Sequence, residues 1–424
     1  MDDILVTGLG ALSCLGSGAD AFWRGMNDPR PAPRRVPDPL ARMDLPLMYL
    51  VPEADLPDGP EECDGLPLGR GTQFAWEAAR QAVADAGLGG ADGLRGVDPR
   101  RVAVAISSGM GDSDLRERRR AVELAGAERT GAGPAARHER WLPDADARPA
   151  ADRWLPAFPA ASVVGGLLGA RGPSTCLSNA CAASGYALSV AADLIRCGEA
   201  DVVVAGGTDA YSRVALGCFN RLGAVDPERC RPFAADRQGT VFGEGAAVLV
   251  LESAAHARRR GAGPGYARLA GAGWSCDAHH ATAPEPGGEQ IERAMRQALA
   301  QAGATGEEVG FVVPHGTGTA LNDVVESRVL GSVLGAAAAR TPVYSAKALV
   351  GHTGGAAGAF AALAAALVLH HRTVPANVPV GPLDPECALS LPDRAAPPTG
   401  PYGLVNAYAF GGNNVSLVLR EAAR

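Results

Sequence analysis

The stretch Ser178-Asn179-Ala180-Cys181-Ala182-Ala183-Ser184-Gly185 places a cysteine among small residues, directly before a segment that is compatible with a helix. The largely apolar run 200–205 follows, so the order is turn, cysteine, helix, strand. A thiol at a helix N-terminus lies at the positive end of the helix dipole, which favours the thiolate. The pattern predicts a nucleophilic Cys181 in an α/β fold, although a free cysteine is more often a small buried hydrophobic residue.

Composition excludes several classes of protein. The 424 residues carry 39 basic and 46 acidic side chains, a net charge of -7, which is not the signature of a nucleic-acid-binding protein. Nine cysteines without paired spacing argue against a disulfide framework and for a reducing compartment. We find no signal peptide, and the longest apolar candidate, 356–369, is too short to span a membrane. A cytoplasmic protein with no membrane partner is expected.

The first half of the chain, which we place at residues 1–253, alternates apolar strands with helical segments. The strands are expected at 4–10, 102–106, 201–207 and 246–252, and the helices at 19–26, 72–86 and 182–195. Gly8-Leu9-Gly10 is a weak nucleotide-loop signal, and we reject it because no third glycine opens a helix at the right spacing. Residues 111–154 are rich in Arg, Asp, Ala and Pro and are interpreted as a surface excursion.

The second half, residues 254–424, shows the same alternation of apolar strands and helical segments. Strands are expected at 266–272, 309–313, 404–409 and 415–419, and helices at 289–302 and 356–369. Cys181 opens an Ala-rich helix in the first half, and the turn that begins at His352 opens another in the second. A duplicated α/β unit would bring both helix starts to a common centre, because open α/β sheets gather their chemistry at one set of element ends.

Four side chains form a candidate catalytic set: Cys181, His315, His352 and Lys347. A thiolate that attacks a thioester, with two neutral imidazoles that can donate to a developing enolate, suits carbon–carbon bond formation. Lys347 is the only lysine in the chain and could hold one imidazole in a chosen tautomer. Each residue alone is more often structural, and it is their coincidence in small-residue turns that favours catalysis.

Other chemistry is less well supported. The glycine-rich turn Phe410-Gly411-Gly412 can present backbone N–H groups to an oxyanion, together with the N–H of Cys181. A papain-like hydrolase would also use Cys and His, but the duplication and the second histidine do not fit it. His279-His280 and His370-His371 are adjacent pairs without ligand spacing, so no metal site is expected.

The chain resembles the elongating β-ketoacyl-acyl carrier protein synthases over nearly its whole length. The motifs that carry the resemblance are 180–185 around the cysteine, 314–319 with Asn322-Asp323, Ser345-Ala346-Lys347 with Gly351-His352-Thr353, and 410–414. The resemblance implies the thiolase fold, two similar βαβαβαββ halves in a five-layer αβαβα arrangement, usually as a dimer. It also implies an enzyme without a bound cofactor, because the phosphopantetheine arm belongs to the partner acyl carrier protein.

The same resemblance assigns roles to individual residues. Cys181 would accept the acyl chain, and His315 and His352 would promote decarboxylation of a malonyl-type extender and stabilise its enolate. Lys347 would orient His315. Phe410 and Gly411 would form the gate and oxyanion hole with Cys181, and Thr317, Thr319 and Asn413 would contact the acyl and malonyl thioesters.

Several positions depart from the family pattern, and they favour a specialised polyketide or polyene pathway over ordinary fatty-acid elongation. The departures are Ala234 and Thr240 in the segment 232–240, Pro314 before His315, and Ala361 where a glutamate is common. One alternative is a catalytically limited partner subunit of a ketosynthase heterodimer, against which the presence of Cys181 argues. The other is an acyltransferase or cyclase that uses the same acyl-cysteine. Chain length, extender and the choice between homodimer and heterodimer stay open.

Overall fold

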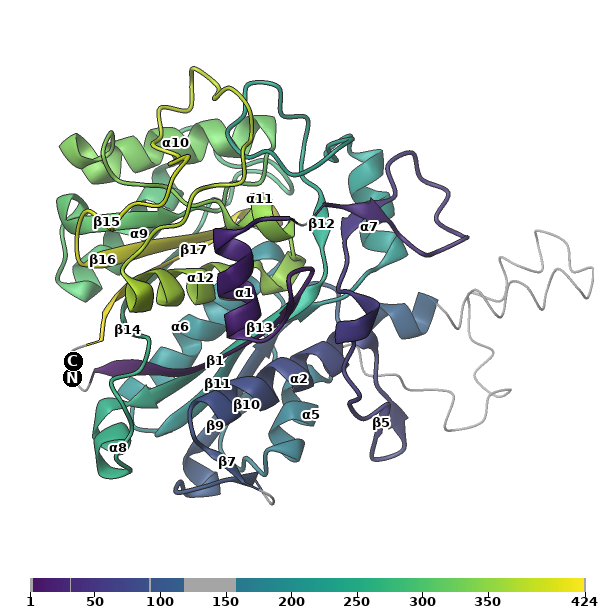
Figure 1. Cartoon of the computed structure of the whole chain (residues 1–424), viewed down its shortest axis with the longest axis vertical. Coiled ribbons are helices and arrows are strands. Elements are labelled where there is room, and N and C mark those ends of the chain that lie inside the picture. The colour runs from purple at the N-terminus through teal and green to yellow at the C-terminus, as the bar shows by residue number, and fades with distance from the viewer. Residues whose placement is uncertain (1–2, 31, 91–92, 118–157, 423–424) are drawn as a thin grey trace, which may run out of the picture.

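A mixed β-sheet runs through the whole molecule in the computed structural model, which describes residues 3–30, 32–90, 93–117 and 158–422 (Figure 1). Its strands follow the order β10-β9-β11-β13-β1-β14-β17-β16-β15. The first-half strands are β1 (Ile4–Ser13), β9 (Val102–Ser107), β10 (Ser174–Thr175), β11 (Val202–Asp209) and β13 (Gly245–Ser253). The second-half strands are β14 (Ala267–Cys276), β15 (Val309–Val313), β16 (Tyr402–Ala409) and β17 (Asn413–Glu421).

The two halves of the sheet have the same strand order. From its outer edge inward, the first half runs through its third, second, fourth, fifth and first strands. The second half does the same if Val343, which forms a parallel bridge with Val312 of β15, is counted as its third strand. The first strands of the two halves, β1 and β14, pair antiparallel at the centre. This confirms the predicted duplication; the boundary at residue 253 falls between β13 and α8 (Ala254–Arg259) and stays a prediction.

The helices and the two halves of the sheet form five layers. The buried helices α6 (Ala183–Arg196) and α12 (Ala357–His371) pack against each other between the two half-sheets (Figure 1). On the outer faces lie α2 (Arg70–Asp85) and α5 (Ala160–Leu167) over the first half, and α9 (Glu289–Ala302) and α10 (Ala320–Leu334) over the second. This arrangement is the predicted αβαβα order, and it brings the N-terminal ends of α6 and α12 together.

Paired glycines let one outer helix of each half approach a strand closely. A Cβ at Gly8 or Gly10 of β1 would lie 2.1 Å from the Ala82 carbonyl oxygen or 1.9 Å from that of Ala78, both in α2. The second half repeats this arrangement: a Cβ at Gly271 or Gly273 of β14 would lie 2.1 Å from the Ala298 carbonyl oxygen or 2.2 Å from that of Ala294, both in α9. The Gly-x-Gly of the first strand is therefore a close-packing feature and not a nucleotide loop.

The central helix is longer than expected. The 3-10 turn η7 (Gly354–Ala356) and α12 form one apolar segment, Gly354–His371, of 18 residues, which is long and apolar enough to cross a membrane. Of this segment, 89% is buried inside the protein. The segment is therefore accounted for as the core helix between the half-sheets, which is why it carries no polar face.

The aromatic side chain of Phe360 anchors α12. It is 1% exposed, and its ring stacks on Phe22 of α1 (Ala19–Asn27) at a centroid distance of 5.6 Å. Phe360→Ala is expected to lower the free energy of unfolding by about 3–5 kcal/mol, because a core cavity replaces the ring. Urea denaturation measures this loss, and Val214→Ala, at a side chain that is 64% exposed, is the control that should change little. Equal stability of the two variants would contradict the assignment of Phe360 to the core.

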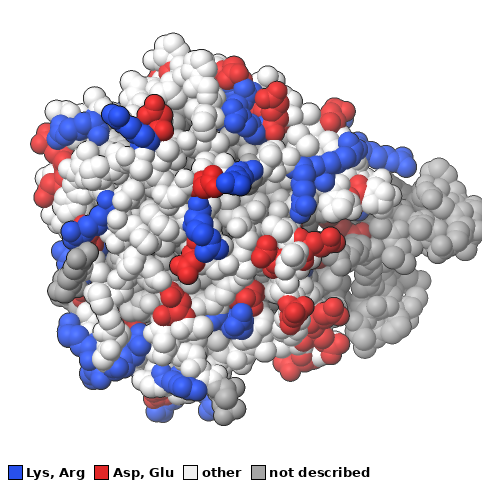
Figure 2. Space-filling view, viewed as in Figure 1, with Lys and Arg blue, Asp and Glu red and all other residues white. Residues whose placement is uncertain are grey.

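The remaining elements are short and connect the layers. They are β2 (Gly16–Ser17), β3 (Arg34–Arg35), β4 (Leu47–Tyr49), β5 (Glu62–Cys63), β6 (Leu66–Pro67), β7 (Gly89–Gly90), β8 (Gly93–Leu94), β12 (Phe242–Gly243), α7 (Arg213–Arg221) and α11 (Ala346–Val350). Most of the excursion expected at 111–154 lies outside the described residues. On the face shown in Figure 2, basic and acidic side chains are interspersed over most of the surface. All nine cysteines are free thiols.

Candidate active site

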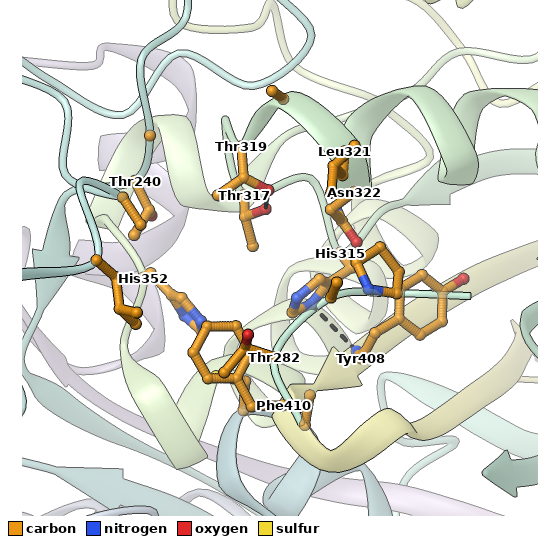
Figure 3. Close-up of a pocket in the computed structure, with 18 of the residues that line it drawn as sticks. Thr240, Thr282, His315, Thr317, Thr319, Leu321, Asn322, His352, Tyr408 and Phe410 are labelled. Carbon is orange, nitrogen blue, oxygen red and sulfur yellow. Dashed lines mark hydrogen bonds between the residues drawn. The ribbon is translucent and has the colours of Figure 1, made fainter. Parts of the chain in front are cut away.

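Cys181 lines a pocket of about 430 Å³. Both predicted histidines line the same pocket (Figure 3). The cysteine belongs to the 3-10 turn η4 (Ala180–Ala182), directly before α6. Ala180 has a φ of 46°, a left-handed conformation that non-glycine residues rarely adopt, so the chain turns sharply into the helix at this point. Cys181, His315 and His352 thus line one cavity, as expected from the sequence.

The thiol of Cys181 is less acidic than its position at a helix start predicts. Burial raises its pKa to about 12, and the Asp209 carboxylate acts in the same direction, whereas Lys347 acts against both. Desolvation therefore outweighs the favourable effect that we expected from the helix dipole. The direction of this shift favours the thiol over the thiolate, so a nucleophilic step passes the thiol proton to a base.

His315 sits in the turn between β15 and α10, and its backbone is fixed by a carboxylate of that helix. The N–H groups of His315 and Gly316 donate to the two oxygens of Glu326, each at 2.7 Å. Asp323, one helical turn earlier, accepts the N–H groups of Thr317 and Gly318 at 3.1 Å. Because residues at i and i+3 share a helix face, both carboxylates of α10 face this turn.

The tautomer of His315 follows from its hydrogen bonds. The backbone N–H of Tyr408 donates to His315 Nδ1 at 3.2 Å (Figure 3), and the Lys347 ammonium lies 3.4 Å from the same nitrogen. Nδ1 is thus an acceptor, and the ring proton of the neutral imidazole lies on Nε2. Burial, together with Lys347 and His352, lowers the pKa of His315 well below its usual value, so the ring stays neutral.

His352 lies between α11 and η7, beside β12. Its N–H donates to the Val241 carbonyl at 2.8 Å, and its ring stacks on Phe242 with 5.5 Å between centroids. Burial lowers the pKa of His352 well below its usual value, with Lys347 acting in the same direction. Its Nδ1 has no hydrogen-bond partner among the described residues. The rings of His352 and His315 are 5.8 Å apart and nearly perpendicular.

Lys347 is buried in α11 behind the two imidazoles. Its Nζ donates to the His315 carbonyl oxygen at 2.5 Å, in addition to the longer contact with Nδ1. Burial lowers the pKa of Lys347, whereas the nearby Glu326 carboxyl raises it. The lone lysine of the chain therefore holds the backbone of His315 more closely than it holds the ring, and its charge acts on all three predicted catalytic groups.

A row of aromatic rings runs from the predicted gate to His352. The ring of Phe410 stacks on Phe219 of α7 at 5.1 Å, Phe219 meets Phe242 edge-on at 4.7 Å, and Phe242 stacks on His352. The N–H of Gly411 donates to the Ala281 carbonyl at 2.8 Å. Gly411 is therefore not free to serve as an oxyanion donor, which corrects that part of the prediction.

The predicted substrate contacts separate into two groups. Thr317 and Thr319 line the pocket, with their hydroxyl oxygens 2.9 Å apart (Figure 3). Asn413 does not line it: its amide oxygen accepts from Asn179 at 3.4 Å, and the neighbouring Asn414 reaches the pocket wall instead. At the mouth, Leu222 and Leu321 are 55% and 60% exposed.

Three further residues of the site, Glu326, Tyr408 and Phe219, were not predicted from the sequence. Glu326 stands three residues after the Asp323 of the recognised motif, and this helical spacing was a usable signal. The Tyr408 contribution is a backbone N–H, which no residue pattern reveals. Phe219 lies on α7, a short helix that we did not expect. The described residues form no group of three or more His, Cys, Asp or Glu side chains that could hold a metal ion.

Comparison with known families identifies the chain. Residues 64–257 match the β-ketoacyl synthase N-terminal domain, and residues 266–380 match the β-ketoacyl synthase C-terminal domain. The chain belongs to the β-ketoacyl synthase family. This membership confirms the resemblance that the cysteine, histidine and lysine motifs indicated, and it confirms an acyl-transferring enzyme that forms β-ketoacyl products by condensation.

Named relatives of this β-ketoacyl synthase match along the whole chain. Nodulation protein E of Rhizobium meliloti (strain 1021) is 33% identical over 99% of both chains. The 3-oxoacyl-[acyl-carrier-protein] synthase 2 of Staphylococcus aureus (strain N315) is 32% identical over 99% of this chain and 98% of its own. A solved structure of the ishigamide ketosynthase/chain length factor superposes with a TM-score of 0.83, at 34% identity and full coverage of both chains. The thiolase-type fold is thereby confirmed.

Proposed function

We propose that this β-ketoacyl synthase extends an acyl chain held on Cys181 with a malonyl-type unit held on an acyl carrier protein. One observation carries the proposal: Cys181, His315 and His352 line the same pocket, with Thr317 and Thr319 on its wall. Both imidazoles are neutral, and that of His315 carries its proton on Nε2. The site thus combines a nucleophile with uncharged hydrogen-bond donors, which decarboxylative condensation requires.

Loading transfers the acyl chain to Cys181. The sulfur attacks the carbonyl carbon of the carrier thioester, and the thiol proton passes to an imidazole of the same pocket. The N–H groups of Cys181 and Phe410 stabilise the tetrahedral oxyanion. The intermediate collapses with cleavage of the carbon–sulfur bond to the phosphopantetheine arm, and the departing thiolate takes up the proton. Acyl-Cys181 and a free carrier thiol result.

Condensation then joins the two units. The malonyl carboxylate leaves as carbon dioxide, and the electron pair of the broken bond moves onto the thioester as an enolate. Nε2–H of His315 and an N–H of His352 hydrogen-bond the enolate oxygen. The enolate carbon attacks the carbonyl of acyl-Cys181, and the cysteine sulfur leaves as a thiolate that takes up a proton from solvent. The product is a β-ketoacyl carrier, longer by two carbons for a malonyl unit.

The remaining assignments follow from chemistry and from relatives. The enzyme needs no cofactor of its own, because the phosphopantetheine arm arrives with the carrier. We assign it to the cytoplasm, where its nine free thiols stay reduced. Thr240 and Ala361, where family members commonly carry larger residues, support a specialised polyketide or polyene pathway. The ishigamide ketosynthase/chain length factor supports a dimer, of like subunits or with a related subunit.

Intact-mass analysis after incubation with acyl carriers and a malonyl carrier tests the proposal. The expected result is a mass gain on the enzyme equal to the acyl group, followed by a carrier product with a two-carbon gain and loss of carbon dioxide. Loading without condensation, with activity only after addition of a related subunit, would instead identify a limited partner subunit. Transfer of the acyl group to an amine or alcohol without the two-carbon gain would identify an acyltransferase.

A further inference from the structure

Asp209 is a buried carboxylate at the end of β11 that the reaction scheme does not use. Its side chain is 4% exposed, and burial raises its pKa. Oδ1 accepts the Ser108 hydroxyl at 2.6 Å and the Met110 N–H at 2.9 Å, and Oδ2 accepts the Gly355 N–H at 2.5 Å. The Gly109 N–H lies 3.1 Å from both oxygens. Four neutral donors therefore converge on one carboxylate.

The direction of these hydrogen bonds favours the ionised form of Asp209. Three of the donors are backbone N–H groups, which can only donate. The fourth is the Ser108 hydroxyl, whose oxygen already accepts the N–H of Gly111 at 2.7 Å, so its hydrogen points to Asp209. Every proton in the cluster thus comes from a neighbour, and hydrogen bonding to the charged form acts against the effect of burial on the Asp209 pKa.

The carboxylate joins the two halves of the fold beside the pocket. Residues 108–110 follow β9 in the first half, whereas Gly355 lies three residues after His352 in the second. The joint has no free space: a Cβ at Gly354 would lie 2.3 Å from Asp209 Oδ2, and one at Gly355 would lie 2.3 Å from the Gly109 nitrogen. The turn that carries His352 is therefore held against the first half through Asp209.

Asp209 also acts on Cys181 through its charge. The charged groups that act on the thiol are Lys347, which lowers its pKa, and Asp209, which raises it. The imidazoles of His315 and His352, which line the same pocket, are neutral. Removal of the Asp209 charge would leave the ammonium of Lys347 unopposed.

We propose that Asp209 is a positioning residue that fixes the turn of His352 against the first half of the fold. The inference rests on the proposed role of His352. Substitution of Asp209 is expected to have opposite effects at two places: slower decarboxylation at His352, and faster reaction of the Cys181 thiol, whose pKa the Asp209 carboxylate raises. A merely structural role produces only losses.

Asp209→Asn tests both effects, because an amide keeps the size of the side chain but offers one acceptor in place of two and no charge. Decarboxylation of malonyl carrier is expected to fall by about tenfold or more, since small displacements of catalytic groups have effects of this size. Alkylation of Cys181 by iodoacetamide at mildly alkaline pH is expected to become about twofold to tenfold faster, because a larger thiolate fraction outweighs the lower nucleophilicity.

Peptide mass spectrometry follows each cysteine separately, and the buried Cys230, which is 1% exposed, reports whether the variant stays folded. Asp193→Asn, at an exposed carboxylate of α6 that pairs with Arg196, is the matched control and should change neither rate. Ser108→Ala removes one donor but keeps the charge. It should therefore slow decarboxylation without faster alkylation of Cys181.

An Asp209→Asn enzyme with an unreactive Cys230 and an unchanged decarboxylation rate would overturn the inference. Slower decarboxylation together with slower alkylation of Cys181 would also overturn it, because a merely structural role produces that pattern. If Asp209→Asn does not fold, the Ser108→Ala variant tests the positioning role of Asp209. An unchanged decarboxylation rate in that variant overturns this role. Failure of the proposed function itself is distinguishable. In that case His352→Ala would decarboxylate malonyl carrier at the wild-type rate, whereas the alkylation readout does not depend on His352.

Discussion

Cys181→Ala is expected to abolish acyl loading, with no mass gain on the enzyme after incubation with any acyl carrier. The thiol is the acceptor of the acyl chain in the proposed mechanism, and a methyl group has no nucleophile to replace it. The decarboxylating groups are left in place, because His315 is fixed by Glu326 and Tyr408 and not by the cysteine. Condensation should therefore disappear while decarboxylation of malonyl carrier continues.

The control for this variant lies at the other end of the same helix. Cys197, at the C-terminal end of α6, is exposed, and Cys197→Ala removes an equal number of atoms far from the pocket. It should load the acyl chain at the wild-type rate. Transfer of a labelled acyl chain to the Cys181→Ala enzyme would refute the assignment of the nucleophile.

His352→Ala is expected to lower the rate of decarboxylation and condensation by roughly 10²–10⁴-fold, the usual loss when a positioned proton donor is removed. Acyl loading should persist to a larger degree, because Cys181 and the N–H groups near the sulfur remain. Single-turnover assays with pre-loaded acyl enzyme separate the two steps. A variant that condenses at the wild-type rate would show that His352 does not act on the enolate.

His371→Ala is the matched control for that variant. His371 lies at the far end of α12, is exposed, and stacks on Trp23 at 4.1 Å. Its removal alters the surface end of the helix whose other end carries the His352 turn. Neither loading nor condensation should change, and a comparable loss in both histidine variants would point to a disturbance of α12 in place of a catalytic effect.

The elements that carry strong apolar periodicity were predictable from sequence. The helix expected at 289–302 is α9, with Gly303 in the left-handed conformation at its end, and the strand expected at 309–313 is β15. In contrast, α10 was missed because its apolar residues are spread around the helix and many are buried on more than one side. The helix α7 was missed because only Leu216 within it is buried.

The members of the site could be predicted, but their protonation could not. The identities of Cys181, His315, His352 and Lys347 follow from residue type and turn context. The direction of the Cys181 pKa shift depends on burial, which local sequence does not report, and burial acts against the effect of the helix dipole. The tautomer of His315 depends on the Tyr408 N–H, whose position is set by the register of β16 against its neighbours.

The glycines at 8, 10, 271 and 273 have a consequence for any saturation mutagenesis of this enzyme. At each of them a side chain would collide with the main chain of a helix, so selection for function should reject nearly every replacement. In a table of tolerated substitutions these positions will look as strict as the nucleophile. Intolerance to substitution alone will therefore not identify the reaction centre of this protein. The two glycine pairs will instead mark matching positions in the two duplicated halves of the fold.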